Sequence, residues 1–154
     1  MKRTRLAWAS WFSITAAIVT FSCLAQSVPH PWAGFRVGSW AAYRTRSIGG
    51  SDTETLTRFE LTALSATSAT VKIEVDRNGK TASQDLHYAI PWDHSEKPPS
   101  GEETIEIGGR RLKCHVVIYP EEGVKIWKCD AIPGFMVKTE TKKTITTLFD
   151  FEVK

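Results

Sequence analysis

The stretch from Arg110 to Thr139 constrains the fold of this chain more than any other part of the sequence. Two runs within it, 112–119 and 124–129, are rich in apolar, β-branched and aromatic residues, which is typical of strands. The Pro-Glu-Glu-Gly sequence at 120–123 separates them and consists of residue types that form turns. The stretch therefore predicts an antiparallel hairpin followed by the start of a third strand.

Two cysteines fall at matching positions of this hairpin. If Tyr119 faces Val124 across the turn, Cys114 lies opposite Cys129, because each cysteine is equally far from its end of the turn. Directly opposed residues in a non-hydrogen-bonded antiparallel pair have Cα atoms about 4.5 Å apart, a distance that a disulfide tolerates. We therefore predict a disulfide between Cys114 and Cys129, which closes a loop of about 16 residues and contributes about 3 kcal/mol in the chain-entropy model.

The beginning of the chain has the pattern of an export signal. Three basic residues lie within the first five positions, and the run from Leu6 to Leu24 carries no charge. Small side chains then permit cleavage after Ala25. We therefore expect residues 1–25 to be a signal peptide and the protein to be periplasmic or secreted. The alternatives are an uncleaved N-terminal helix that anchors the chain, and lipidation at Cys23.

Removal of the signal changes the charge and the cysteine count of what remains. Residues 26–154, which we expect to form a single antiparallel β domain, hold 17 basic and 17 acidic residues. A net charge of zero with no long basic cluster offers nothing to attract phosphate groups, so we exclude nucleic acid as a partner. Cys114 and Cys129 are then the only thiols left, and in an oxidising compartment an even pair is expected to be bonded.

The rest of the chain alternates strand-like runs with turn residues. The clearest run, 69–76, alternates apolar and polar residues throughout, which predicts one buried and one solvated face. The Asn-Gly pair at 78–79 follows directly and predicts a tight type I′ hairpin. We expect strands near 39–48, 54–64, 69–76, 81–90, 104–107, 112–119, 124–129, 135–141 and 144–153.

Two segments lack strand character. Residues 28–38 contain two prolines and two glycines, which predicts an extended lead-in whose Trp32 and Phe35 cap one end of the core. Residues 91–103 form a connection longer than most in a compact domain, and loops of that length are usually functional or mobile.

No window of the chain after the signal shows helical periodicity. The predicted fold is therefore all-β, a single antiparallel sheet of about eight or nine strands curled into a barrel or half-barrel, with little or no helix; a sandwich is the alternative. Leu56 and Leu64 break the alternation of their run, which a β-bulge or burial on both faces would explain. We expect the inner side of the sheet to carry Trp40, Phe59, Ile73, Leu86, Trp127 and Phe149.

Catalytic motifs are missing from the sequence. There is no G-x-S-x-G, H-E-x-x-H, C-x-x-C, P-loop or dinucleotide fingerprint. A hydrolase-like site would have to combine His87 with Asp93 and His94 in the long loop, yet nothing fixes the geometry of these three. Without a nucleophile in an activating context, we predict that the protein is not an enzyme.

A metal site is the other sharp hypothesis. Cys114, His115, Cys129 and Asp130 are ligand types for zinc, but neighbouring residues on a strand point to opposite faces. Cys114 and His115 therefore cannot both reach one ion without distortion. We expect no metal and no cofactor.

Aromatic residues are the best candidates for a binding site. Aromatic side chains line apolar pockets and interfaces, although packing in the core explains them as well. The function expected is a binding module for an apolar or lipidic ligand or for an envelope partner; the alternative is a structural protein of the cell envelope with a filled core. The candidate ligand-binding residues are Trp40, Tyr43, Phe59, Tyr88, Trp92, Trp127 and Phe135.

A pattern of a dozen positions resembles a set of small bacterial exported proteins of unknown function. The pattern is G-x-W-x-x-Y at 38–43, then W-x-x-x-x-x-P-G-x-x-x-K at 127–138, with Leu-Phe-Asp-Phe at 148–151. In strand order the chain is also similar to the half-barrel of LolA- and LolB-type periplasmic lipoprotein carriers. That resemblance implies a concave sheet able to shelter an acyl chain. Those carriers close their half-barrels with helices, whereas this sequence predicts none, so we expect binding at an open face or edge.

Overall fold

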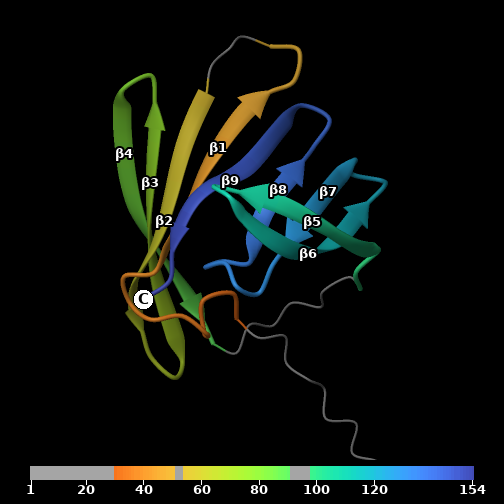
Figure 1. Cartoon of the computed structure of the whole chain (residues 1–154). Coiled ribbons are helices and arrows are strands. Elements are labelled where there is room, and N and C mark those ends of the chain that lie inside the picture. Colours follow the sequence, from red (N-terminus) through yellow and green to blue (C-terminus); the bar gives the residue numbers. More distant parts are fainter. Residues whose placement is uncertain (1–29, 51–53, 91–97) are drawn as a thin grey trace, which may run out of the picture.

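The computed structural model describes residues 30–50, 54–90 and 98–154, and the predicted signal peptide at 1–25 lies outside them. Its described residues form one antiparallel sheet and no helix (Figure 1), which confirms the predicted fold class. Nothing in this part of the chain is a helix that could cross a membrane. The nine strands are β1 (Trp40–Ser47), β2 (Glu54–Leu64), β3 (Ser68–Arg77), β4 (Lys80–Ala89), β5 (Gly101–Ile107), β6 (Arg110–Tyr119), β7 (Val124–Lys128), β8 (Met136–Glu140) and β9 (Thr144–Glu152).

The sheet consists of two meanders joined at one seam. Its strand order is β4-β3-β2-β1-β9-β8-β7-β6-β5, so β1 to β4 and β5 to β9 each run in sequence order, and β9 pairs with β1. The strands β4 and β5 follow one another along the chain but form the two opposite edges of the sheet. The hydrogen-bonded sheet is therefore open, as in a half-barrel, and does not close into a barrel.

The second half of the sheet curls back on itself, and its core also takes in side chains of β1. β5 contacts β9 although three strands separate them in the sheet, and in Figure 1 β5 and β6 lie across β8 and β9. The enclosed space is filled by buried side chains from both halves. These residues form cluster 1: Ala41, Tyr43, Ile107, Leu112, Cys114, Val116, Trp127, Cys129, Ile132, Val137 and Leu148.

A second core lies under the lead-in segment. Trp32 and Phe35 are buried against the sheet, as predicted for aromatic caps. The lead-in is not extended, however, because it folds into turns in which the amide of Ala33 donates to the carbonyl of His30 and that of Phe35 to the carbonyl of Trp32. Cluster 2 comprises Trp32, Phe35, Leu61, Ala69 and Val71.

The Asn-Gly turn has the predicted geometry. Asn78 and Gly79 have φ of 56° and 74°, and Arg77 pairs with Lys80 across the turn. The connection before β5 is shorter than predicted, since β5 begins at Gly101 instead of Thr104. Most of that connection, 91–97, lies outside the described residues.

Two β-bulges change the pairing register along the sheet, and one of them accounts for Leu64. The β2–β3 register shifts between Leu61 and Ala63, so Leu64 pairs with Ala69 and lies on the same face as Leu61. The β1–β9 register shifts so that Ala42 pairs with Asp150 but Tyr43 with Leu148. Phe149 is the extra residue of this second bulge.

The prediction that Phe149 and Trp40 lie on the inner side of the sheet is wrong. Leu148 is buried in cluster 1, whereas Phe149, next to it, is 40% exposed and lies on the other face because of the bulge. Trp40 precedes Ala41, an inner residue of cluster 1, and therefore faces outward; its indole nitrogen donates to the exposed Glu152.

The predicted hairpin register is confirmed, but the predicted disulfide is wrong. Tyr119 pairs with Val124 and Val116 with Trp127, yet Cys114 and Cys129 are both free thiols, buried in cluster 1. The strand β7 ends at Lys128, one residue before Cys129. There the chain turns toward β8, and the amide of Cys129 donates to the carbonyl of Phe135 at 2.7 Å, so the ladder that would hold the two cysteines in register has already ended.

Candidate functional site

Hollows lie on both faces of the half of the sheet formed by β1 to β4. Residues paired directly across two strands lie on the same face, so Ala41, Phe59 and Ile73 mark one face and Ala42, Arg58 and Glu74 the other. The first is called the inner face, because it covers clusters 1 and 2, and the second the outer face.

The inner cavity lies between the two clusters and has a volume of about 210 Å³. Tyr43 of cluster 1 and Trp32 of cluster 2 both line it, and Phe59 packs against both clusters. No lining side chain carries a permanent charge. The complete lining is His30, Pro31, Trp32, Tyr43, Phe59, Tyr88, Gly134 and Met136.

Ring contacts fix the walls of the inner cavity. The rings of Tyr43 and Phe59 pack edge to face, with centroids 5.6 Å apart, and those of His30 and Tyr88 are tilted at 5.4 Å. Such pairs are favourable beyond the area they bury. The hydroxyl of Tyr43 also donates to the carbonyl oxygen of Met136 at 2.9 Å, which ties β1 to the opposite wall.

The ionisable groups of the inner cavity are held in their neutral forms. The imidazole of His30 is buried, and burial lowers its pKa, because the charged form loses hydration. Its Nδ1 accepts the backbone N–H of Trp32 at 3.2 Å, so that nitrogen carries a lone pair. Burial also raises the pKa of Tyr43 and of Tyr88 above the ordinary value for a phenol. The cavity is therefore uncharged at neutral pH.

A close backbone approach closes the floor of the cavity. Gly134 has φ of +79°, and a Cβ at this position would lie 3.2 Å from the Trp32 ring. The amide of Gly134 donates to the carbonyl of Pro31, which clamps the lead-in onto the turn before β8. A glycine is required here both for the left-handed backbone and for the space it leaves to Trp32.

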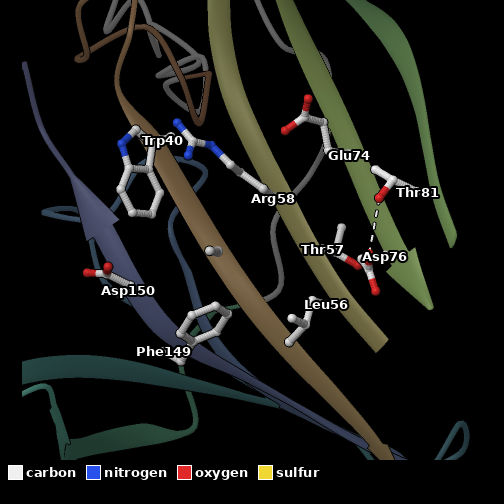
Figure 2. A pocket seen from close by; sticks show the side chains of 10 residues that line it. Trp40, Leu56, Thr57, Arg58, Glu74, Asp76, Thr81, Phe149 and Asp150 are labelled. Carbon is white, nitrogen blue, oxygen red and sulfur yellow. Dashed lines mark hydrogen bonds between the residues drawn. The ribbon is translucent and has the colours of Figure 1, made fainter. Parts of the chain in front are cut away.

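The outer hollow has a volume of about 340 Å³ and lies over β9, β1, β2, β3 and the start of β4 (Figure 2). Its apolar part consists of Trp40, Ala42, Leu56 and Phe149. Charged and polar side chains surround this apolar part, unlike the inner cavity. They are Thr57, Arg58, Glu74, Asp76, Thr81 and Asp150.

Arginine side chains stack on both aromatic rings of the outer hollow. The Arg58 guanidinium carbon lies 4.3 Å from the centroid of Trp40, and that of Arg44 lies 5.2 Å from the centroid of Phe149. Both arginines are also paired with acids: Arg58 with Glu60 at 3.2 Å, and Arg44 with Glu54 at 2.7 Å. Figure 2 shows Arg58 beside the Trp40 ring at one end of the hollow.

The structure divides the seven predicted ligand-binding residues among several places. Tyr43, Phe59 and Tyr88 meet in the inner cavity, while Trp40 lines the outer hollow. Trp127 is buried in cluster 1, where its indole nitrogen donates to Glu103 at 2.6 Å, and it lines neither hollow. Phe135 packs edge to face on Phe35 and lines neither hollow. Trp92 lies outside the described residues.

Several lining residues were not predicted. His30 and Met136 reach the inner cavity only because the lead-in and the turn before β8 fold back over the sheet, which no local pattern indicates. Phe149 reaches the outer hollow through the bulge. Leu56, for which a bulge or burial on both faces was expected, shows neither, since it pairs in register with Arg44 and Asp76 and lies exposed on the outer face.

The residues of the catalytic and metal hypotheses do not come together in the described part of the chain. Nδ1 of His87 lies 3.0 Å from the hydroxyl oxygen of Thr70 on the exposed outer face, while Asp93 and His94 fall in 91–97, outside the described residues. Cys114 is buried and the neighbouring His115 exposed, on opposite faces as predicted. Across 30–50, 54–90 and 98–154, no three His, Cys, Asp or Glu side chains are grouped closely enough to hold a metal ion.

Comparisons with known proteins identify no relative: no family model matches the chain, and no curated protein and no solved structure is significantly similar to it.

Proposed function

We propose that this protein is an exported, non-enzymatic binding module whose inner cavity takes the apolar end of a small or lipidic ligand. The observation that carries the proposal is an uncharged, aromatic-lined cavity between two well-packed clusters. The cavity is partly open to the surface, so a ligand can enter it.

The volume of the cavity limits what it can hold. Pockets for drug-sized ligands measure about 300–1,000 Å³, and an engineered apolar cavity of about 150 Å³ holds benzene. At about 210 Å³, the inner cavity suits a single ring or the end of an acyl chain. The remainder of a larger ligand would stay outside, at the open side of the half-barrel.

The chemistry of the lining selects against charge. A charged group inside would lose its hydration and meet no opposite charge, because His30 is neutral and the other lining groups are apolar or phenolic. An apolar chain instead gains about 25 cal/mol for each Å² removed from water. The resemblance to carriers that shelter acyl chains in a half-barrel agrees with this choice of ligand.

A fatty acid brominated at its methyl end tests the proposal, because bromine quenches tryptophan fluorescence only at short range. We expect saturable quenching that is lost in Trp32→Phe, since Trp32 lines the cavity, and retained in Trp40→Phe, since Trp40 lies on the outer face. Phe59→Trp places a larger ring in the cavity and should weaken binding.

Two outcomes would contradict the proposal. Saturable quenching that survives Trp32→Phe but disappears in Trp40→Phe would move the ligand to the outer face. A folded protein with no saturable quenching would favour the alternative function, a structural envelope protein with a filled core.

A further inference from the structure

The outer hollow owes its shape to one small side chain. Ala42 lies in a row of paired residues between Asp150 on β9 and Arg58 on β2, and the next residues on the same face of β1, Trp40 and Arg44, are large. Its methyl group leaves a depression between these neighbours. Leu56 and Phe149, respectively 37% and 40% exposed, extend the apolar floor along β2 and β9.

The charges around this floor are unequal. Among the lining residues, one guanidinium, from Arg58, stands against three carboxylates, from Glu74, Asp76 and Asp150. A second guanidinium, from Arg44, stacks on Phe149 from outside the lining and is paired with Glu54. Arg58 is paired with Glu60 and stacked on Trp40, and Glu74 is paired with Lys72 at 2.7 Å. The Arg58 guanidinium is therefore already paired with Glu60, an acid outside the lining of the hollow.

Two of the carboxylates have only neutral donors. Asp76 accepts hydrogen bonds from the amide of Gly79 and the hydroxyl of Thr81, and Asp150 accepts one from the amide of Phe151. Among the described residues, neither carboxylate forms an ion pair with a lysine or an arginine. Figure 2 places Asp76 and Asp150 on opposite sides of the apolar floor.

We propose that the outer hollow is a second binding site, separate from the inner cavity, and that it takes an organic cation with an apolar body, such as an alkylammonium ion. The alkyl chain lies on Ala42, Leu56 and Phe149, and the ammonium group faces Asp76 or Asp150. An anion would meet these two uncompensated carboxylates, and an uncharged chain would leave them unused.

The aromatic rings at this surface support the same ligand class. Both rings already hold a guanidinium against their faces, at 4.3 Å for Trp40 and 5.2 Å for Phe149, so this surface attracts cations through the ring quadrupole as well as through the carboxylates. The proposed site does not resemble one for a bare metal ion, because most of its surface is apolar and, within the described residues, no three His, Cys, Asp or Glu side chains are grouped closely enough to hold one.

Binding of n-octylammonium to the folded protein, followed by NMR chemical shifts, tests the proposal against octanoate and octanol. We expect shifts at Ala42, Leu56 and Phe149, tighter binding of the amine than of the acid or the alcohol, and weaker binding at high salt. Equal binding of all three compounds, or shifts confined to the inner cavity, would overturn it.

Matched variants assign the binding to the hollow. Asp76→Asn and Asp150→Asn keep shape but remove charge, and each should weaken octylammonium binding about two- to fivefold, the range for an exposed ion pair. Asp85→Asn, on the outer face but outside the lining, should leave octylammonium binding unchanged.

Ala42→Leu fills the depression and should abolish octylammonium binding, while Phe59→Trp, in the inner cavity, should have no effect on it. If neither Asp variant changes the affinity, the carboxylates play no part.

The ammonium group could come from a free amine or from a lipid headgroup. Vesicles containing phosphatidylethanolamine, compared with vesicles of phosphatidylglycerol, distinguish these sources by co-sedimentation. If the protein binds octylammonium but not the phosphatidylethanolamine vesicles, the ligand is a free amine. If it binds octylammonium and these vesicles, the ligand is the lipid headgroup. Preference for phosphatidylglycerol would contradict the proposal.

Discussion

The inner cavity and the outer hollow differ in chemistry although β1 and β2 contribute to both. The inner cavity is lined by aromatic rings and holds no charge, whereas the outer hollow has an apolar floor among three carboxylates and a guanidinium. Alternation along the strands separates the two sets of side chains, and the bulge in β9 adds Phe149 to the outer set. One sheet thus carries two chemically distinct surfaces, and the residues at its bulges decide which surface each aromatic side chain joins.

The largest expected difference between the faces is in stability, and two neighbouring residues measure it. Leu148→Ala should lower the free energy of unfolding by about 2–5 kcal/mol, the usual cost of truncating a buried leucine. Phe149→Ala should cost less than about 1 kcal/mol, because Phe149 is exposed and its main contact is the stacked Arg44. Urea unfolding of the two variants gives both values. Equal losses would mean that the bulge does not separate the two side chains.

Thiol reactivity gives the next largest contrast. Burial raises the pKa of Cys114 to about 11 from an ordinary value of 9, so little thiolate exists at pH 8, and alkylation of Cys114 should be slow until the protein unfolds. A cysteine placed on the exposed outer face by Ser83→Cys should react at once. Because the folded-state pKa is raised, the stability that Cys114 contributes is complete below pH 9 and is lost as the pH rises toward 11.

Peptide mapping after alkylation in denaturant, without a reducing agent, checks the state of both cysteines. Modification of Cys114 and Cys129 is the expected result, since both are free thiols. A linked pair of unmodified peptides would show a disulfide instead and would falsify this assignment.

The smallest expected effect is the pH dependence that His30 contributes. Burial lowers its pKa, so the stability that it contributes is present above the ordinary value of 6.5 and is lost as the pH falls through the lowered folded-state pKa. His30→Asn should flatten the acid side of the stability profile, and Ser83→Asn, on the exposed outer face, should leave it unchanged. Urea unfolding between pH 5 and 8 measures both, and identical profiles for His30→Asn and the parent would remove His30 as the source.

Local pattern was enough to predict most of the sheet. The alternation at 69–76, the Asn-Gly turn and the spacing of residues around 120–123 depend on neighbours in sequence, and the strands, the turn and the hairpin register that they predict are all present. The same information could not place Phe149, because a bulge inserts one residue without any change in composition.

Contacts between distant segments account for the other differences. The disulfide prediction assumed that the ladder continues through Cys129, but the ladder ends at Lys128, where the chain turns toward β8. The inner cavity forms where the lead-in meets Gly134, some hundred residues later in the chain, and local periodicity carries no information about such a meeting. Tyr43, Phe59 and Tyr88 were among the predicted residues because aromatic side chains commonly line apolar pockets.

The position of β9 in the sheet has a consequence for how the protein folds. Each meander can assemble from consecutive hairpins with short loops, but the seam joins Ala42 to Asp150, and the amide of Lys154 donates to the hydroxyl of Ser39 across a comparable separation. Closing so long a loop is entropically slow, so the β1–β9 seam is expected to form late. Until β9 is in place, the edges of β1 and β8 both stay unpaired.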